Sequence, residues 1–134
     1  MAVVNRIDHI AIAVKDLDAA LERFTANFDF PVSGLGDVPG LNIRRAFLTI
    51  GDAALELFQP TTGSNPATKF LAERGEGMYI LSLEVDDLHA ASETLAQRGI
   101  KLNIQNVPNG RSLGFISPKV THGVLLQLVE RPKA

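Results

Sequence analysis

The strongest constraint on the fold of this chain is an internal repeat. The segment IDHIAIAVKDLDAA at 7–20 aligns with MYILSLEVDDLHAA at 78–91, at an offset of 71 positions (78 minus 7). The offset places His9 opposite Ile80, so one copy carries an imidazole where the other carries a hydrocarbon. A repeat of this kind predicts two copies of one supersecondary unit that do not bury their sheets alone. The residues that the two copies share are Val14 and Val85, Asp16 and Asp87, Leu17 and Leu88, and Ala19-Ala20 and Ala90-Ala91.

Both halves of the chain predict the same order of elements. Residues 5–14 are rich in β-branched and apolar side chains and predict a strand, after which Asp16 can cap a helix. Three short strands follow, and the second half repeats this order with a helix that ends at Gly99. Asn109-Gly110 predicts a hairpin turn between strands of the second half. A short helix at 64–77 connects the two halves.

These elements predict one domain, 1–134, of the α+β class. Two β-α-β-β-β modules in tandem, at about 5–60 and about 78–131, would form one barrel-like curved sheet around a cavity. The 134 residues suit a single domain, and 46% hydrophobic with 21% charged residues is the balance of a globular protein.

The composition also excludes several classes of function. A formal net charge of −2 gives no broad basic face, so we expect no nucleic-acid partner. The absence of cysteine excludes disulfides, thiolate metal sites and cysteine nucleophiles. The start MAVVNRIDH has no long apolar core and no apolar run reaches about 18 residues, so we expect no membrane partner and a cytoplasmic location.

The repeat also predicts which side chains share the cavity. The offset that pairs His9 with Ile80 pairs Glu56 with Gln127, and these four positions would lie in one cross-section. Glu56 and Gln127 are polar residues flanked by leucines, and the alternation of a strand could point either one inward or outward. His9 could face the cavity or be a core histidine bonded to the backbone.

Five segments, in order and correctly spaced, resemble the vicinal oxygen chelate superfamily, which has the glyoxalase and extradiol-dioxygenase fold. Within it, the closest likeness is to the methylmalonyl-CoA epimerases. The likeness implies an isomerase or lyase acting at a carbon next to a carbonyl or thioester, on a small molecule such as an acyl-CoA or a carboxylate. The five segments are IDHIAIAVKDLDAALERF, FLTIGDAALELFQP, KFLAERGEG, LEVDDL and GVLLQLVER.

The resemblance implies a metal site with one ligand from each of four strands. His9 matches the first ligand and Glu56 matches the second. The third ligand in the family is the second histidine of a His-His pair, and this pair reads Tyr79-Ile80 here. The fourth ligand in the family is a glutamate, and the matching residue here is Gln127. Two strong ligands and one amide would hold a divalent metal (Co, Mn, Zn or Mg) weakly or not at all, because catalytic zinc normally has three protein ligands.

Without metal, the resemblance implies a proton-transfer site. His9 and Glu56 would be the general acid–base pair, and Gln127 would donate its amide to an oxyanion. Ile80 and Tyr79 would contact substrate. Arg44 and Arg45 straddle a strand, and an inward Arg45 could hold a substrate carboxylate; a solvated edge position is the alternative.

Two other functions remain open from the sequence. One is a metal-free small-molecule binding protein of the bleomycin-resistance type; the other is a glyoxalase- or dioxygenase-like enzyme. We also expect a homodimer, because such modules usually leave a sheet edge or an apolar face to cover.

Overall fold

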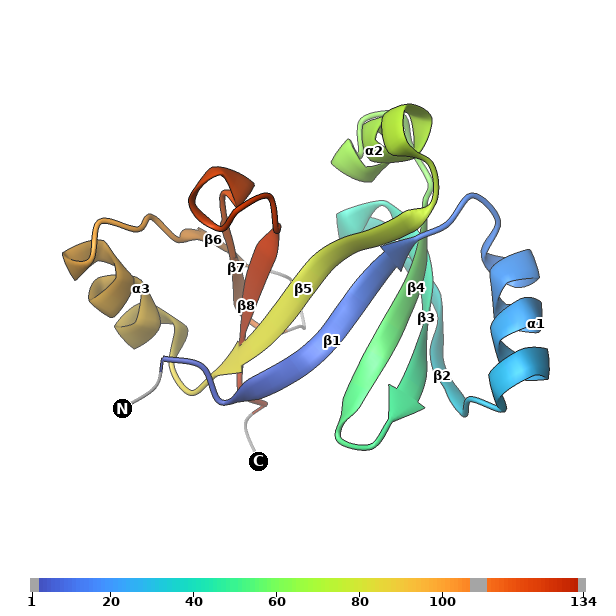
Figure 1. The fold of residues 1–134 in the computed structure, drawn as a ribbon, viewed down its shortest axis with the longest axis horizontal. Helices are drawn as coiled ribbons and strands as arrows, with labels where there is room; N and C mark the ends of the chain where they lie inside the picture. Colours follow the sequence, from blue (N-terminus) through green and yellow to red (C-terminus); the bar gives the residue numbers. More distant parts are fainter. Residues whose placement is uncertain (1–2, 107–110, 133–134) are drawn as a thin grey trace. The chain divides into compact units, whose positions relative to one another are not determined.

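The order of elements along the chain is the one that the repeat predicts. The structure is a computed structural model that describes residues 3–106 and 111–132, so the turn expected at Asn109-Gly110 lies outside the described residues. Two β-α-β-β-β modules follow one another, with a helix between them, which confirms the α+β class and the predicted fold (Figure 1). The elements are β1 Arg6–Ala13, α1 Leu17–Phe28, β2 Val32–Val38, β3 Ile43–Ile50, β4 Ala53–Pro60, α2 Pro66–Arg74, β5 Gly77–Val85, α3 Leu88–Gln97, β6 Asn103–Gln105, β7 Leu113–Ile116 and β8 Leu126–Glu130, with 3-10 turns at Pro39–Leu41 and Pro118–Val120.

The chain divides into two compact units. The first unit comprises residues 9–79, and its strands run in the order β2-β3-β4-β1. The second unit comprises residues 1–8 and 80–134, with the order β5-β8-β7-β6. Within each unit the first and last strands of the module are parallel and the other pairs are antiparallel. That the two units form one domain around one cavity stays a prediction.

The strand register reproduces the repeat of the sequence. Ala11 on β1 lies opposite Glu56 on β4, and Ser82 on β5 lies opposite Gln127 on β8. Both members of the second pair follow the first by 71 positions (82 minus 11, and 127 minus 56). The sequence repeat is therefore a structural repeat, down to the pairing of individual residues.

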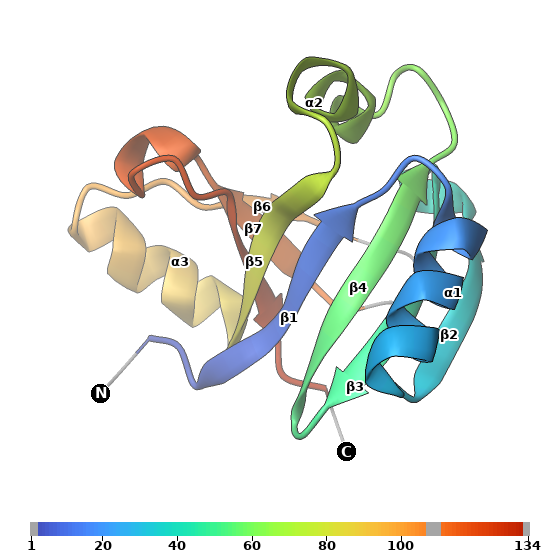
Figure 2. The same cartoon turned by 45° about the vertical axis from the view of Figure 1, so that its right-hand side comes forward.

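Each module covers one face of its strands with a helix. In the first unit, α1 lies against β3 and β4 (Figure 2) and packs Leu17 on Leu48 and Leu57. Because side chains alternate along a strand, Glu56 lies on the face opposite α1. In the second unit, α3 packs on Leu128, so Gln127 lies on the face opposite α3. The candidate site residues Glu56 and Gln127 therefore each lie on the face that the helix of their own unit does not cover.

The two module helices begin in the same way. Asp16 and Asp87 each accept a hydrogen bond from a backbone N–H of the first turn, at 3.2 Å and 3.0 Å. A second acceptor comes from the last strand of the same module: Gln59 Oε1 binds the first N–H of α1 at 2.9 Å, and Glu130 Oε2 binds that of α3 at 3.1 Å. These bonds satisfy N–H groups that have no partner inside the helix.

Among the described residues, 3–106 and 111–132, no helix is long and apolar enough to cross a membrane.

The cap of α3 gives a stability prediction. Asp87→Ala should lower the free energy of unfolding by about 1 kcal/mol, because an N–H of the first turn loses its acceptor. Glu93→Ala, at an exposed position inside the same helix, is the matched control and should change stability by less than about 0.5 kcal/mol. Urea unfolding followed by circular dichroism measures both, and equal losses would contradict the capping role.

Candidate active site

His9 and Glu56 lie close together on the face opposite α1. His9 Nε2 is 3.8 Å from Glu56 Oε1, and the two side chains are 12% and 9% exposed. Glu56 pairs in register with Ala11, two residues beyond His9 on β1, so the imidazole and the carboxylate are diagonal neighbours on adjacent strands. The small Ala11 side chain, which is fully buried, allows this approach.

Arg45 on β3 holds the other oxygen of the Glu56 carboxylate. Its Nη1 donates a hydrogen bond to Glu56 Oε2 at 3.1 Å, and its guanidinium lies 4.9 Å from the centre of the Phe47 ring. Phe47 pairs with Glu56 in register and also meets His9 edge-on, with ring centres 5.8 Å apart and an interplanar angle of 84°. The Phe47 ring therefore contacts both the Arg45 guanidinium and the His9 imidazole.

The neighbouring arginine points the other way. Arg44 donates to Asp18 of α1 at 3.0 Å, on the helix-covered side of β3. The two arginines therefore lie on opposite faces of β3, as predicted. Arg45 is on the face opposite α1, where its partner is the Glu56 carboxylate. That this face is turned to a cavity stays a prediction.

The donor set does not fit a resident divalent metal. Within residues 9–79 the predicted ligands are His9 and Glu56, and the described part of the chain holds no group of three His, Cys, Asp or Glu side chains placed to bind one ion. Arg45 already neutralises the Glu56 carboxylate at 3.1 Å, and a dication on Glu56 would meet that fixed positive charge.

The two predicted ligand positions of the second unit, Ile80 and Gln127, carry no histidine or carboxylate. The Gln127 Oε1 atom, the natural metal donor of an amide, is bonded to the Ser82 hydroxyl at 2.9 Å, and both residues are buried. Ile80 is a partly buried hydrocarbon at the position where the family resemblance calls for a histidine.

Tyr79 lies in an aromatic cluster of the first unit. Its ring centre is 5.8 Å from that of Phe58 on β4 and 4.9 Å from that of Phe70 on α2. Burial raises the pKa of the Tyr79 phenol, so the hydroxyl stays neutral at physiological pH. Phe58 is two residues beyond Glu56 on β4, so both side chains lie on the same face of the strand. The aromatic cluster therefore begins beside the carboxylate.

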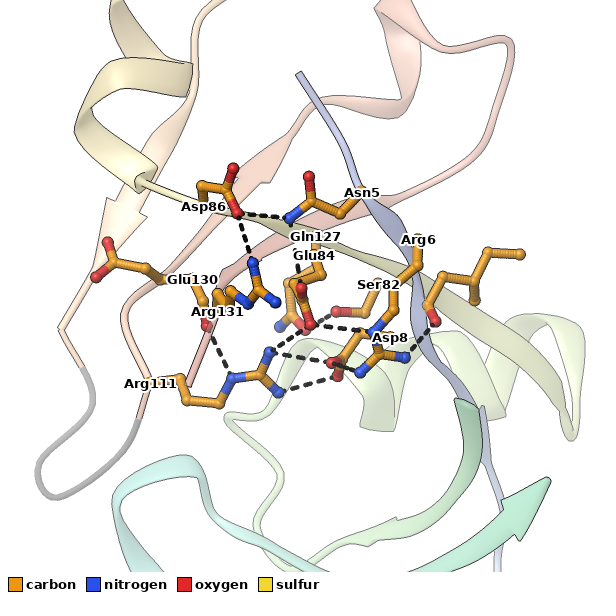
Figure 3. Close-up of polar contacts among 11 residues, drawn as sticks. Asn5, Arg6, Asp8, Ser82, Glu84, Asp86, Arg111, Gln127, Glu130 and Arg131 are labelled. Atoms are coloured by element: carbon orange, nitrogen blue, oxygen red, sulfur yellow. Dashed lines mark hydrogen bonds and ion pairs between the residues drawn. The ribbon is translucent and has the colours of Figure 1, made fainter. Parts of the chain in front are cut away.

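A charged cluster that the sequence analysis did not single out lies in the second unit (Figure 3). The carboxylates of Asp8 and Glu84 are buried, and guanidinium groups flank them. Arg6 Nε donates to Glu84 at 3.1 Å, and Arg111 Nη1 donates to Asp8 at 3.1 Å. Arg111 Nη2 is also 3.0 Å from Asp8 and 3.9 Å from Glu84.

One signal in the sequence could have found part of this cluster. Ser82 and Glu84 are polar at alternate positions of an otherwise apolar strand, where the first module has Ala11 and Ala13. Alternation places both on the face opposite α3, together with Gln127. The partner Arg111 had no such signal, because it is far away along the chain.

The charged cluster gives a second stability prediction. Arg111→Met should cost about 3 kcal/mol, because it keeps an apolar stem but leaves two buried carboxylates short of positive charge. Arg131→Met is the matched control, because Arg131 and its partner Asp86 are 66% and 67% exposed and such pairs contribute less than about 1 kcal/mol. Chemical unfolding of the two variants checks this, and equal costs would show that the cluster is not a buried network.

Comparisons with known proteins agree with the fold and with the placement of the strands. Residues 8–116 match the family model described as the Glyoxalase/Bleomycin resistance protein/Dioxygenase superfamily. The chain is 30% identical over 131 residues to the uncharacterized protein YqjC of Bacillus subtilis, covering 95% of this chain and 93% of that one. It is 30% identical over 129 residues to the mitochondrial methylmalonyl-CoA epimerase of Homo sapiens, covering 93% of this chain and 73% of the relative.

Solved structures of similar proteins have the same fold over nearly the whole chain. A crystal structure of methylmalonyl-CoA epimerase from Mycobacterium tuberculosis matches with a TM-score of 0.91 and 31% identity, covering 99% of this chain and 92% of that chain. A variant of the Streptomyces coelicolor methylmalonyl-CoA epimerase, in complex with 2-nitronate-propionyl-CoA, matches with a TM-score of 0.88 and 31% identity, covering 97% and 99%. With its repeat, its strand register and these matches, the chain belongs to the glyoxalase/bleomycin resistance protein/dioxygenase superfamily, and its relatives at about 30% identity include methylmalonyl-CoA epimerases.

Proposed function

We propose that this protein is an epimerase-type isomerase that moves a proton at a carbon next to a carbonyl or thioester, without a resident divalent metal. The observation that carries the proposal is the arrangement of Glu56, whose Oε1 lies 3.8 Å from His9 Nε2 while Arg45 holds Oε2. Relatives that cover nearly the whole chain are methylmalonyl-CoA epimerases, which supports the reaction type. A lyase that starts with the same proton abstraction is the nearest variant of this proposal.

The chemistry requires two groups that exchange protons with one carbon. A carbon between a thioester and a carboxylate loses its proton to a positioned base, and the electron pair moves into the carbonyl as an enolate. Return of a proton to the opposite face inverts the centre and restores the substrate atoms unchanged. Because Arg45 holds one oxygen of Glu56, we propose that the other oxygen and the His9 imidazole, 3.8 Å apart, remove the proton from one face of the carbon. The proton that returns to the opposite face then comes from water or from a group outside this pair.

The enolate also needs a hydrogen-bond donor. For Gln127 the proposal rests on the repeat and the family match, which assign it to the site. Its carbonyl oxygen is bonded to the Ser82 hydroxyl, and this bond leaves the amide N–H₂ as the group able to donate to an oxyanion. Ile80 and Tyr79 remain proposed as substrate contacts on the same sequence grounds.

The proposal includes a homodimer. Strand β2 lies at the edge of the first unit's strand order, and it exposes Val32 and Leu35 at 43% and 54%. An exposed edge with apolar side chains is the kind of surface that a second copy covers.

Proton exchange tests the proposed reaction. The protein should catalyse exchange of the α-proton of methylmalonyl-CoA with D₂O, measured by NMR. Glu56→Gln and His9→Gln should each slow the exchange by about 100-fold or more, since general acid–base groups contribute that much. Glu22→Gln, at an exposed position of α1, is the control and should leave the rate unchanged. Tight binding of the acyl-CoA without exchange would favour a binding protein instead.

Metal titration tests the metal-free part of the proposal. The protein should show no stoichiometric Co²⁺ or Mn²⁺ binding at micromolar concentration by calorimetry, and a chelator should leave the exchange rate unchanged. Arg45→Gln should tighten metal binding by about tenfold or more, because it removes a positive charge beside Glu56. Arg44→Gln, on the other face of β3, should not. Nanomolar, stoichiometric binding by the unmodified protein would overturn this expectation.

A further inference from the structure

We infer that Phe47 is a positioning residue of the proposed reaction, and that a glycine bulge in β2 holds its ring in place. The inference rests on the proposed function for the pair that is positioned, His9 and Glu56. It adds what that function leaves open, namely which part of the first unit keeps an imidazole and a guanidinium at different oxygens of one carboxylate.

Phe47 contacts both partners of the Glu56 carboxylate. Its ring meets the His9 imidazole edge-on, with ring centres 5.8 Å apart and an interplanar angle of 84°. The Arg45 guanidinium lies over the same ring, 4.9 Å from its centre. Phe47 also pairs in register with Glu56, so the ring stands next to the carboxylate that both groups approach.

The contact with the ring restricts how Arg45 binds the carboxylate. An arginine often takes both oxygens of a carboxylate with two parallel hydrogen bonds. Here Arg45 donates from Nη1 to Oε2 of Glu56, whereas Oε1 lies 3.8 Å from His9 Nε2. A guanidinium that is held over the Phe47 ring is less free to turn toward Oε1 as well. This oxygen therefore stays available to the imidazole and to the proton that is removed.

The position of the Phe47 ring depends on a β-bulge in β2. The pairing of Ser33 with Phe47 is followed by a pairing three residues later on β2 (36 minus 33) but only two residues earlier on β3 (47 minus 45). Gly34 lies inside this bulge with a φ of 63°, in the left-handed region that favours glycine. A Cβ atom built on Gly34 would lie 3.0 Å from Cδ2 of Phe47. The backbone of Gly34 therefore packs directly on the ring, and a methyl group there would displace it.

Gly51 offers a matched position without this contact. It lies in the turn between β3 and β4 of the same unit with a φ of 56°, so an alanine there meets the same kind of backbone strain as an alanine at Gly34. A Cβ atom built on Gly51 meets nothing within 4 Å. An effect on the site that Gly34→Ala has and Gly51→Ala lacks is therefore caused by displacement of the ring.

NMR reads the position of the His9 imidazole directly. The imidazole C–H signals of His9, assigned by their loss in His9→Gln, should show NOEs to the Phe47 ring protons, because the two rings are in contact. Gly34→Ala should shift these signals and weaken the NOEs, whereas Gly51→Ala should leave both unchanged. Equal spectra of the two alanine variants would overturn the inference.

Exchange kinetics measure the effect of the ring on the reaction. With methylmalonyl-CoA in D₂O, Gly34→Ala should lower kcat for α-proton exchange about tenfold and keep KM within about twofold, because the ring orients the acid–base pair. Gly51→Ala should keep the kcat of the unmodified protein. Phe47→Leu should lower kcat as Gly34→Ala does, and Phe47→Tyr, which keeps an aromatic ring, should retain most of it.

The two readouts separate this inference from the proposed function. Absence of exchange in the unmodified protein would refute the catalysis, and the NMR comparison would still decide whether Gly34 and Phe47 hold the imidazole. Full exchange rates in Gly34→Ala and Phe47→Leu would keep the catalysis and overturn the role of Phe47. Circular dichroism checks that each variant is folded, and if Phe47→Leu does not fold, the two alanine variants decide the question.

Discussion

A buried carboxylate must have a positive partner, and this requirement shapes the polar part of both units. Taking a carboxylate out of water costs several kcal/mol, which close and well-oriented cations offset. Glu56 has Arg45 as this partner, and Asp8 and Glu84 have arginines on both sides. In all these cases the cation belongs to the protein. Guanidinium groups therefore balance the charge of these buried carboxylates.

The repeat shows which features are the same in the two modules and which differ. Helix caps and strand register coincide at the offset of 71 (87 minus 16), because each module needs them to fold. The faces opposite the helices do not coincide: His9 corresponds to Ile80, and Glu56 corresponds to Gln127. The residues on these faces have therefore changed while the caps and the register, which each module needs to fold, have stayed the same.

Much of the fold could be predicted from the sequence, because its signals are local. Alternating apolar residues and the caps Asp16 and Asp87 act over a few residues and define the elements, and the offset of 71 repeats their order in the second half. The closeness of His9 and Glu56 followed from the repeat and the family match. The Arg45 contact with Glu56 could not be derived, because alternation admits either Arg44 or Arg45 as the inward residue.

The charged cluster was beyond prediction for a different reason. Arg111 and Asp8 are 103 positions apart, and nothing in their neighbourhoods marks them as partners. A long-range pair of this kind is determined by how the strands of its unit pack, and a single sequence carries no record of it. The polar alternation of Ser82 and Glu84 indicated only that their face would not be apolar.

The helix caps have a consequence for how such a chain can arise. Gln59 caps α1 and Glu130 caps α3, and each belongs to the last strand of the same module as its helix. All the residues that cap a module's helix therefore lie in one contiguous stretch of sequence. A duplication of that stretch would copy the helix together with its caps. After duplication, substitutions on the opposite face can accumulate in one copy without disturbing the start of either helix. In this chain the parts that coincide in the two modules are those that begin the helices, and the parts that differ include the residues proposed to contact the substrate.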